Sequence, residues 1–168
     1  SGYYGASIFN ENSGSTPTEI LKCVFKNNNA YHAPGIFGTR NSTISHSLFF
    51  ENHSTGPMNA ILANEGGHPT ISNCTFLDDA YAISRGNTSL VTNVTNSIFQ
   101  DSPGPFVQAD ATQFNFENCA FDGNLFGSNP ISGPVELTSA DCGFLPTESS
   151  AAIDAGASGN PDPDGSPL

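Results

Sequence analysis

A phenylalanine recurs along the chain every 16 to 27 residues, and its copies share their polar neighbours. Two positions before it stands a serine or a cysteine, and three positions after it a short polar residue, most often asparagine. The seven copies are Phe9, Phe25, Phe49, Phe76, Phe99, Phe121 and Phe144. Such a period is typical of repeat proteins, in which each unit buries its apolar face against the next unit.

Short β-type runs surround each copy of the motif, and the intervening segments have no helical pattern. One run lies just ahead of the motif, at residues 43–44, 70–71, 94–95 and 114–116. A second run lies midway, at residues 36–37, 60–62, 81–83, 106–107 and 135–137. Gly, Pro, Asn and Ser separate the runs. Two or three short strands per unit, stacked about 4.8 Å apart, predict an all-β fold: a single-stranded parallel β-helix (solenoid) of about seven coils.

The same repeat predicts columns of like residues along the solenoid axis. Phenylalanine and the cysteine or serine should point inward, and the asparagine should occupy a tight bend, because asparagine tolerates left-handed backbone. Stacked amides can also hydrogen-bond along the axis. The predicted column residues are Phe25, Phe49, Phe76, Phe99, Phe121 and Phe144, then Asn28, Asn52 and Asn124, then Cys23, Cys74, Cys119 and Cys142.

Four cysteines in an extracellular chain usually suggest two disulfides. Here Ser47 separates Cys23 from Cys74 by one coil, so their Cα atoms should lie about 9–10 Å apart, too far for a bridge. Cys119 and Cys142 fall on adjacent predicted coils and are the pair within reach. We expect the thiols to pack as small buried apolar groups.

The charge balance excludes some partners. The 168 residues include 16 acidic and 4 basic side chains, which gives a net charge of −12. That balance argues against nucleic acid and anionic membrane surfaces. Since no run approaches the roughly 18 apolar residues of a membrane span, we expect no membrane insertion.

The Phe-x-x-Asn pattern resembles the right-handed parallel β-helix repeats of bacterial surface proteins and of polymorphic outer-membrane proteins. Its copies are Phe9–Asn12, Phe25–Asn28, Phe49–Asn52 and Phe121–Asn124. The tail, Ile153-Asp154-Ala155-Gly156 and then Asp162-Pro163-Asp164-Gly165, resembles the close of secreted β-helix proteins that carry a separate anchor segment. We therefore expect coils over residues 1–144 and a closing segment over 145–168.

In that family a further Asp-Ile-Gly-Ala stretch generally follows, so we expect the closing segment to be truncated at Leu168. The resemblance also implies an extracellular or cell-surface location. It implies no single activity, because the family includes lyases, adhesins and structural proteins.

The tail also contains part of a calcium-loop pattern. Asn160, Asp162, Asp164 and Gly165 fall at positions 1, 3, 5 and 6, where alternate oxygens converge and glycine permits the sharp turn. No glutamate follows at position 12, although Asp154 is available as a further oxygen ligand. A solvated acidic turn is the simpler interpretation, and Ca²⁺ is the alternative; we expect no other cofactor.

Asn-x-Ser/Thr sequons in turn-rich segments make Asn41, Asn87 and Asn93 candidate glycosylation sites. Two further sequons, at Asn52 and Asn73, fall inside the repeat motif and should be poor acceptors.

Parallel β-helices include polysaccharide lyases and hydrolases, and a lyase needs a base and a cation that neutralises the substrate carboxylate. Arg40, Arg85 and Glu65, with His68, form the best candidate cluster, although an exposed arginine beside a glutamate is usually an ion pair. For a hydrolase, Asp78, Asp79 and Asp101 are the candidate carboxylates. We expect a protein without catalysis, and the enzyme stays an alternative.

The preferred function is that of a surface structural module. A solenoid has two open ends, each with unpaired strand edges, and we recognise no capping helix ahead of the first coil. We expect end-to-end contact with identical copies, as a fibre, or with the rest of a longer β-helix. A glycan-binding adhesin is the third alternative.

Overall fold

The computed structural model describes residues 7–10, 17–38, 40–56, 60–64, 67–77, 81–85, 91–100, 106–107, 113–121, 125–140, 143–147 and 149–152. Apart from a 3₁₀ position at Gln113, every regular element in these ranges is a β-strand. The predicted all-β class is therefore confirmed.

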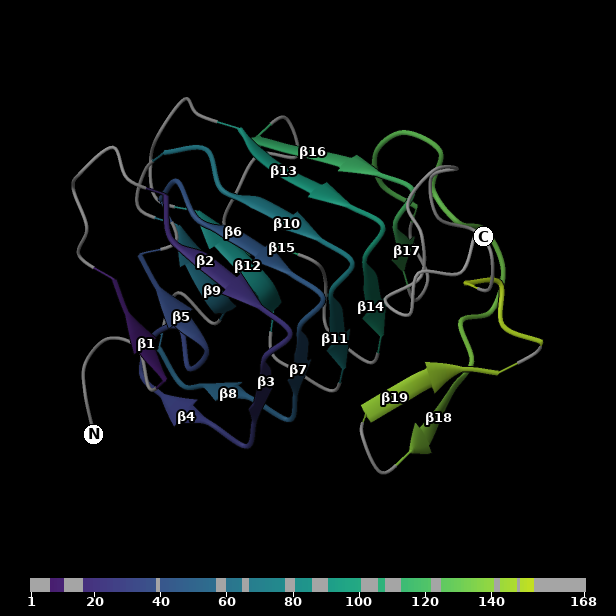
Figure 1. Ribbon diagram of the computed structural model, residues 1–168, viewed down its shortest axis with the longest axis horizontal. Coiled ribbons are helices and arrows are strands. Elements are labelled where there is room, and N and C mark those ends of the chain that lie inside the picture. Colours follow the sequence, from purple (N-terminus) through teal and green to yellow (C-terminus); the bar gives the residue numbers. More distant parts are fainter. Residues whose placement is uncertain are drawn as a thin grey trace.

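Three parallel sheets form the body of the protein, and each contains five strands among the described residues (Figure 1). Sheet A consists of β1 (Ile8–Phe9), β5 (Ile36–Phe37), β9 (Ala60–Asn64), β12 (Tyr81–Arg85) and β15 (Phe106–Val107). Sheet B consists of β2 (Glu19–Leu21), β6 (Thr43–Ser45), β10 (Thr70–Ser72), β13 (Thr92–Thr95) and β16 (Phe114–Glu117). Sheet C consists of β3 (Val24–Lys26), β7 (Leu48–Phe50), β11 (Thr75–Leu77), β14 (Ile98–Gln100) and β17 (Ala120–Phe121).

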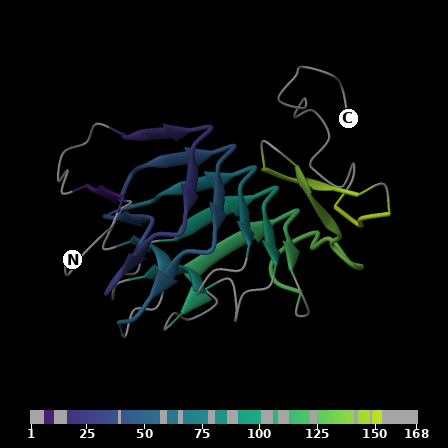
Figure 2. The same cartoon turned by 90° about the horizontal axis from the view of Figure 1, so that it is seen from below.

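The chain passes through the sheets in turn and returns one strand further along each time, which makes a β-solenoid. Figure 2 shows the coils following one another from the purple N-terminal strands to the green ones. A short parallel pair, β4 (Asn29–Ala30) with β8 (His53–Ser54), adds to the first two coils. The predicted parallel β-helix is confirmed.

Strand alternation explains how these short segments build a core. In sheet B the middle apolar residue of each strand points inward, while the residues on either side of it are more polar. Ile44, Ile71 and Val94 are 0–1% exposed and stand opposite one another in register. A single core cluster joins this column to the phenylalanines of sheet C.

The phenylalanine column is formed by five of the predicted residues. Phe25, Phe49, Phe76, Phe99 and Phe121 pair in register across sheet C. Neighbouring ring centroids lie 4.7–5.2 Å apart, and the ring planes are within 9° of parallel. Since the spacing of rings follows the spacing of strands, each ring rests on the ring of the next coil.

The other two phenylalanines do not join this column. Among the described residues each parallel sheet has five strands, which correspond to five coils, where we expected about seven. Phe9 lies in sheet A, where it pairs and stacks with Phe37. Phe144 lies in β19 (Gly143–Pro146), which pairs antiparallel with β18 (Leu137–Ala140) and places Phe144 opposite Ser139. Cys142, Asn124 and residues 153–168 lie outside the described residues.

The left-handed bends occupy a different column from the one predicted. Between sheets B and C, the positive-φ residues are Lys22, His46, Asn73, Asn96 and Asn118. After sheet C, Asn27 and Glu51 have positive φ, one position before the predicted Asn28 and Asn52. Asn28 and Asn52 therefore do not occupy the left-handed bend themselves but follow it directly.

The chain continues past β17 as a half-coil, residues 125–131, that closes the C-terminal end of sheets B and C. Ser128 bridges Glu117 and Ile131 bridges Ala120, both in parallel. Backbone N–H groups of Ser128 and Ile131 donate to Phe116 O and Cys119 O at 2.8 and 2.9 Å. Beyond this terminal half-coil, the β18–β19 hairpin lies past the last sheet strands (Figures 1 and 2).

Candidate functional site

The cysteine and serine column forms a continuous hydrogen-bonded line through the solenoid. The N–H of Cys23 donates to Ser47 Oγ, and the N–H of Cys74 donates to Ser97 Oγ, each at 3.2 Å. Each hydroxyl donates in turn to the carbonyl two residues earlier, Ser45 O or Thr95 O. The column thus satisfies buried backbone groups beside each bend.

The cysteines of this column are free thiols with structural contacts. Cys23, Cys74 and Cys119 form no disulfide, as predicted for Cys23 and Cys74. Burial raises the pKa of Cys74 to about 12 and that of Cys119 to about 11, while backbone hydrogen bonds oppose the shift. Because the thiolate is the reactive form, these two thiols are chemically inert at neutral pH.

The Asn28 and Asn52 side chains form a second internal line. Asn52 is fully buried, and its Oδ1 accepts hydrogen bonds from the backbone N–H and the Nδ2 of Asn28, at 3.1 and 2.9 Å. Its own Nδ2 donates to Phe25 O at 2.9 Å. The predicted amide contact between coils is confirmed, and burial makes the Asn52 sequon inaccessible to glycosylation.

The candidate catalytic residues do not form a described cluster. Arg40 lies in the turn before β6 with φ +26°, directly beneath Gly67 of the next coil. The backbone of Arg85 lies opposite Asn64 at the end of β9. Glu65 and the side chain of Arg85 lie outside the described residues, as do Asp78, Asp79 and Asp101. The loose alignment expected from the sequence therefore yields no convergent acid–base pair in the described part.

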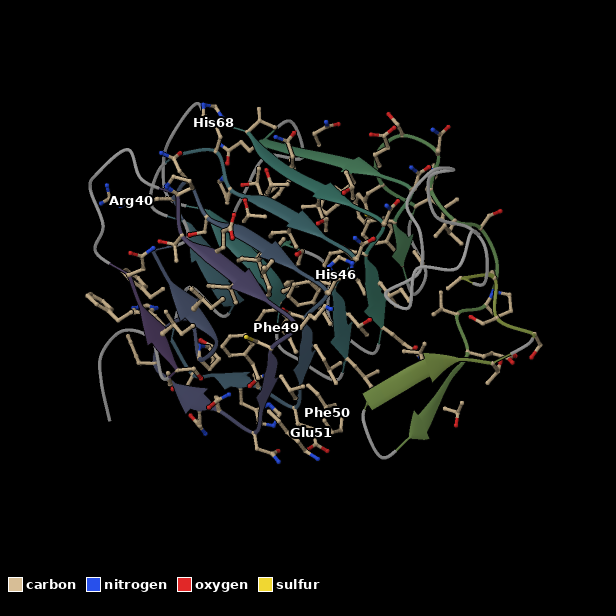
Figure 3. All side chains as sticks on the ribbon, in the orientation of Figure 1. Arg40, His46, Phe49, Phe50, Glu51 and His68 are labelled. Carbon is tan, nitrogen blue, oxygen red and sulfur yellow. The ribbon has the colours of Figure 1, made fainter. Side chains whose placement is uncertain are left out.

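Two histidines stand at opposite ends of the sheet B strands (Figure 3). The backbone N–H of His68 donates to Asn41 Oδ1 at 3.1 Å, and its Nδ1 lies 3.3 Å from Val91 O. At the other end, His46 Nε2 lies 3.4 Å from Asn73 Nδ2. Each exposed imidazole contacts the neighbouring coil, so the turns are tied together by polar contacts.

The predicted metal-binding and glycosylation sites lie partly outside the described residues. The described residues contain no group of three or more His, Cys, Asp or Glu side chains that could hold a metal ion. Asn160, Asp162, Asp164 and Asp154 lie outside the described residues, so the calcium alternative stays a prediction. Asn41 is exposed but bonded to His68, and Asn93 Oδ1 accepts from Asn115 Nδ2 at 3.3 Å. Asn87 also lies outside the described residues.

The N-terminal edge, defined as strands β1, β2 and β3, exposes apolar side chains. These are the first strands of sheets A, B and C, and Phe9, Leu21 and Val24 on them are 49%, 50% and 61% exposed. Tyr31, which follows β4, is 40% exposed. The inward-facing Phe25 is only 6% exposed, so the core is closed to water and the exposed part is the strand edge with its outward side chains.

Both lysines lie on this edge, Lys22 after β2 and Lys26 in β3, and the Lys26 ammonium lies 4.7 Å from the centre of the Phe50 ring. The sequence indicated an uncapped first coil and a closing segment at residues 145–168, but it did not identify the half-coil at residues 125–131. The available signal was at Gly127 and Pro130, which interrupt the repeat just after the last stacked phenylalanine.

Comparison with known proteins shows one match. A family model described as a right-handed β-helix region matches residues 1–151. Searches of curated proteins and of solved structures found no significant match. Among the described residues, no helix is long and apolar enough to cross a membrane.

Proposed function

Because the chain belongs to the right-handed β-helix family, we propose that it is a non-catalytic structural module of an extracellular or cell-surface solenoid. In this role it joins other β-helix coils end to end, so that the stacked sheets continue across the junction. Bacterial surface proteins with the resembling Phe-x-x-Asn repeats give the proposal its location.

The observation that carries the proposal is the use of polar groups within the described coils. The Ser47 and Ser97 hydroxyls and the Asn52 amide all bond to the backbone of the same or an adjacent coil. The buried thiols are held in their neutral form by desolvation. Such groups stabilise coil stacking, and catalysis instead requires groups free to contact a substrate.

A turnover assay tests the absence of catalysis. We expect the protein to release neither unsaturated ends nor new reducing ends from pectate, alginate or neutral glucans, with or without added Ca²⁺. The matched variant is Arg40→Ala with Arg85→Ala. Product that forms with the native chain and disappears in this variant would contradict the proposal and favour the lyase alternative.

Microscopy of native material tests the structural role and the location. An antibody against the chain should label intact cells from its source, and negative staining should show the labelled chain within a longer rod or fibre. Antigen that appears after lysis alone, or labelled particles no longer than a single short rod, would count against the proposed role.

A further inference from the structure

The two ends of the solenoid differ in whether another coil can follow. At the C-terminal end, Ser128 and Ile131 of the terminal half-coil already occupy the hydrogen-bonding positions beside β16 and β17. Their register places Gly127 opposite Phe116 and Pro130 opposite Cys119. Gly127 has no side chain on which a following coil could pack, and Pro130 places a ring where the column otherwise has cysteine or serine.

The cysteine and serine column and the phenylalanine column both end at the terminal half-coil. Pro130 has no backbone N–H, so it cannot repeat the bond that Cys23 and Cys74 make to the serine of the following coil. Phe126 meets Phe121 edge-on, with 5.2 Å between centroids and 76° between planes, and so ends the face-to-face stack. The terminal half-coil is a cap of the kind that solenoids need.

The N-terminal edge keeps the pattern of an interior coil. Leu48 N–H donates to Cys23 O and Asn27 N–H donates to Phe50 O, so Leu48 and Phe50 turn their peptide groups toward the first coil. Val24 and Lys26 stand at the same register positions one strand earlier. Their peptide groups therefore face away from β7, along the free side of an edge strand.

We propose that the N-terminal edge binds a preceding β-helix coil in parallel register, and that this single edge is how the chain joins a longer solenoid. The inference rests on the proposed structural function and adds to it the end, the strand direction and the kind of partner. The coil–coil contact inside the protein is the interface that would continue across the junction.

A second copy of the chain fits this edge poorly. A head-to-tail copy would have to offer its C-terminal end, where the terminal half-coil already covers the edges of sheets B and C. A copy bound edge to edge would run antiparallel and bring Lys22 and Lys26 of both copies to one seam, where like charges repel. On a chain of net charge −12, these lysines instead favour acidic side chains on a different coil.

The partner can be represented by a coil of the protein itself. We would place a copy of residues 42–54, which contains β6, β7 and β8, directly before Ser1. The grafted Phe49 then stands thirteen positions before Ile8, as Phe49 stands thirteen before Leu62 in the protein, and Ile8 and Leu62 share one register through Ile36. The grafted Ser47 would fall next to Cys23 and extend the alternation of the column.

Hydrogen exchange of the Val24 and Lys26 amides gives the readout. In the native chain these amides should exchange freely, and in the grafted chain at least about tenfold more slowly, because they gain acceptors. The matched control carries the same copy after Leu168, where we expect no change at the described terminal half-coil. A second control has aspartate in place of the grafted Phe49 and should lose the protection.

The amides of β11 and β14 report whether the original coils stay folded. A second graft carries an additional Gly-Ser before Ser1, in case the connection between the grafted coil and the chain is too short. Val24 and Lys26 amides that are already protected in the native chain would overturn the inference, as would two grafts that leave them unprotected. If native rods are observed but both grafts fail, the inference about the N-terminal edge is rejected and the structural function stands. If the chain turns over a polysaccharide but the graft succeeds, the non-catalytic function is rejected and the inference about the edge stands.

Discussion

At the scale of single residues, the phenylalanine column was predictable because identical spacing requires identical environments. Phe25, Phe49, Phe76, Phe99 and Phe121 stand 22–27 positions apart, close to the length of one coil. Phe9 precedes Phe25 by 16 positions, which is too short for a full coil, and this gap was the signal that it belongs to another sheet. Motif match alone did not distinguish the two cases.

Replacement of Phe76 by alanine tests the column. The ring is fully buried and stacks on Phe49 and Phe99, so the substitution removes two ring contacts and leaves a cavity. We expect the free energy of unfolding to fall by about 3–5 kcal/mol in urea titrations. Val24→Ala, at an exposed position of the same sheet, is the control and should change stability far less.

The buried thiols predict a dependence on pH. The folded-state pKa values of Cys74 and Cys119 lie above the ordinary thiol value of 9.0, at about 12 and 11, mainly because burial disfavours the thiolate. Their contribution to stability is therefore complete below about pH 9 and is lost as pH rises toward the folded values.

Urea titrations between pH 8 and pH 11 check the loss of stability, and alkylation followed by peptide mass spectrometry checks the burial of the thiols that causes it. At pH 8 the partly exposed Cys23 should react first, and Cys74 and Cys119 should react only after denaturant is added. Rapid labelling of Cys74 in the folded protein would show that the column opens.

At the scale of elements, the sequence predicted where strands occur, but it did not always predict the sheet to which a strand belongs. Nothing in the spacing of Phe144 separates it from the true column, yet β18 and β19 form an antiparallel hairpin. The physical cause lies upstream, where Gly127 and Pro130 stand opposite Phe116 and Cys119 and interrupt the repeat. The left-handed bends were also misplaced, because local backbone preference fixes that a bend exists but does not fix its position to one residue.

The terminal half-coil depends on a glycine. Gly127 has φ +80°, and a Cβ there would lie 2.1 Å from Phe116 O and 2.5 Å from Phe116 Cβ. Gly127→Ala should therefore push the half-coil off the end of sheet B and cost at least about 1 kcal/mol.

Hydrogen exchange and urea unfolding measure this effect. The amides of Ser128 and Ile131 should lose protection first, while those of β7 and β11 keep theirs. Gly133→Ala is the control within the same segment, since it also has positive φ but its nearest contact is the Ala151 side chain. Equal effects of the two substitutions would mean that backbone strain, and not the clash with Phe116, determines the loss.

At the scale of the whole molecule, the fold class followed from the repeat. Arg40 and Arg85 were chosen because the chain has only four basic residues, and Glu65 because it aligns with the coil between them. Glu65 and the Arg85 side chain lie outside the described residues, so that cluster stays a prediction. The difference between the two ends depends on which coil is last, and the sequence reveals that only through the loss of core residues.

Net charge predicts a response to salt. Sixteen acidic and four basic side chains on a short solenoid repel one another in the folded state more than in the extended chain. Raising the NaCl concentration from about 10 mM to about 150 mM shortens the screening length from about 30 Å to about 8 Å and should raise the Tm. Sucrose at matched osmolarity is the control, and a Tm that falls with salt would show that ion pairs outweigh the repulsion.

The strict alternation of cysteine and serine along one column has a consequence for oxidation. Adjacent coils lie about 4.8 Å apart, within the Cα separation of a disulfide, so two neighbouring thiols would be able to cross-link. Each intervening serine keeps the described cysteine sulfurs two coils apart, which is too far for a disulfide. Ser97→Cys should remove that separation, and oxidative refolding from denaturant should then yield a bridge from the introduced thiol to Cys74 or Cys119, detectable as a linked peptide pair, whereas Cys23, Cys74 and Cys119 of the native chain should yield none with one another.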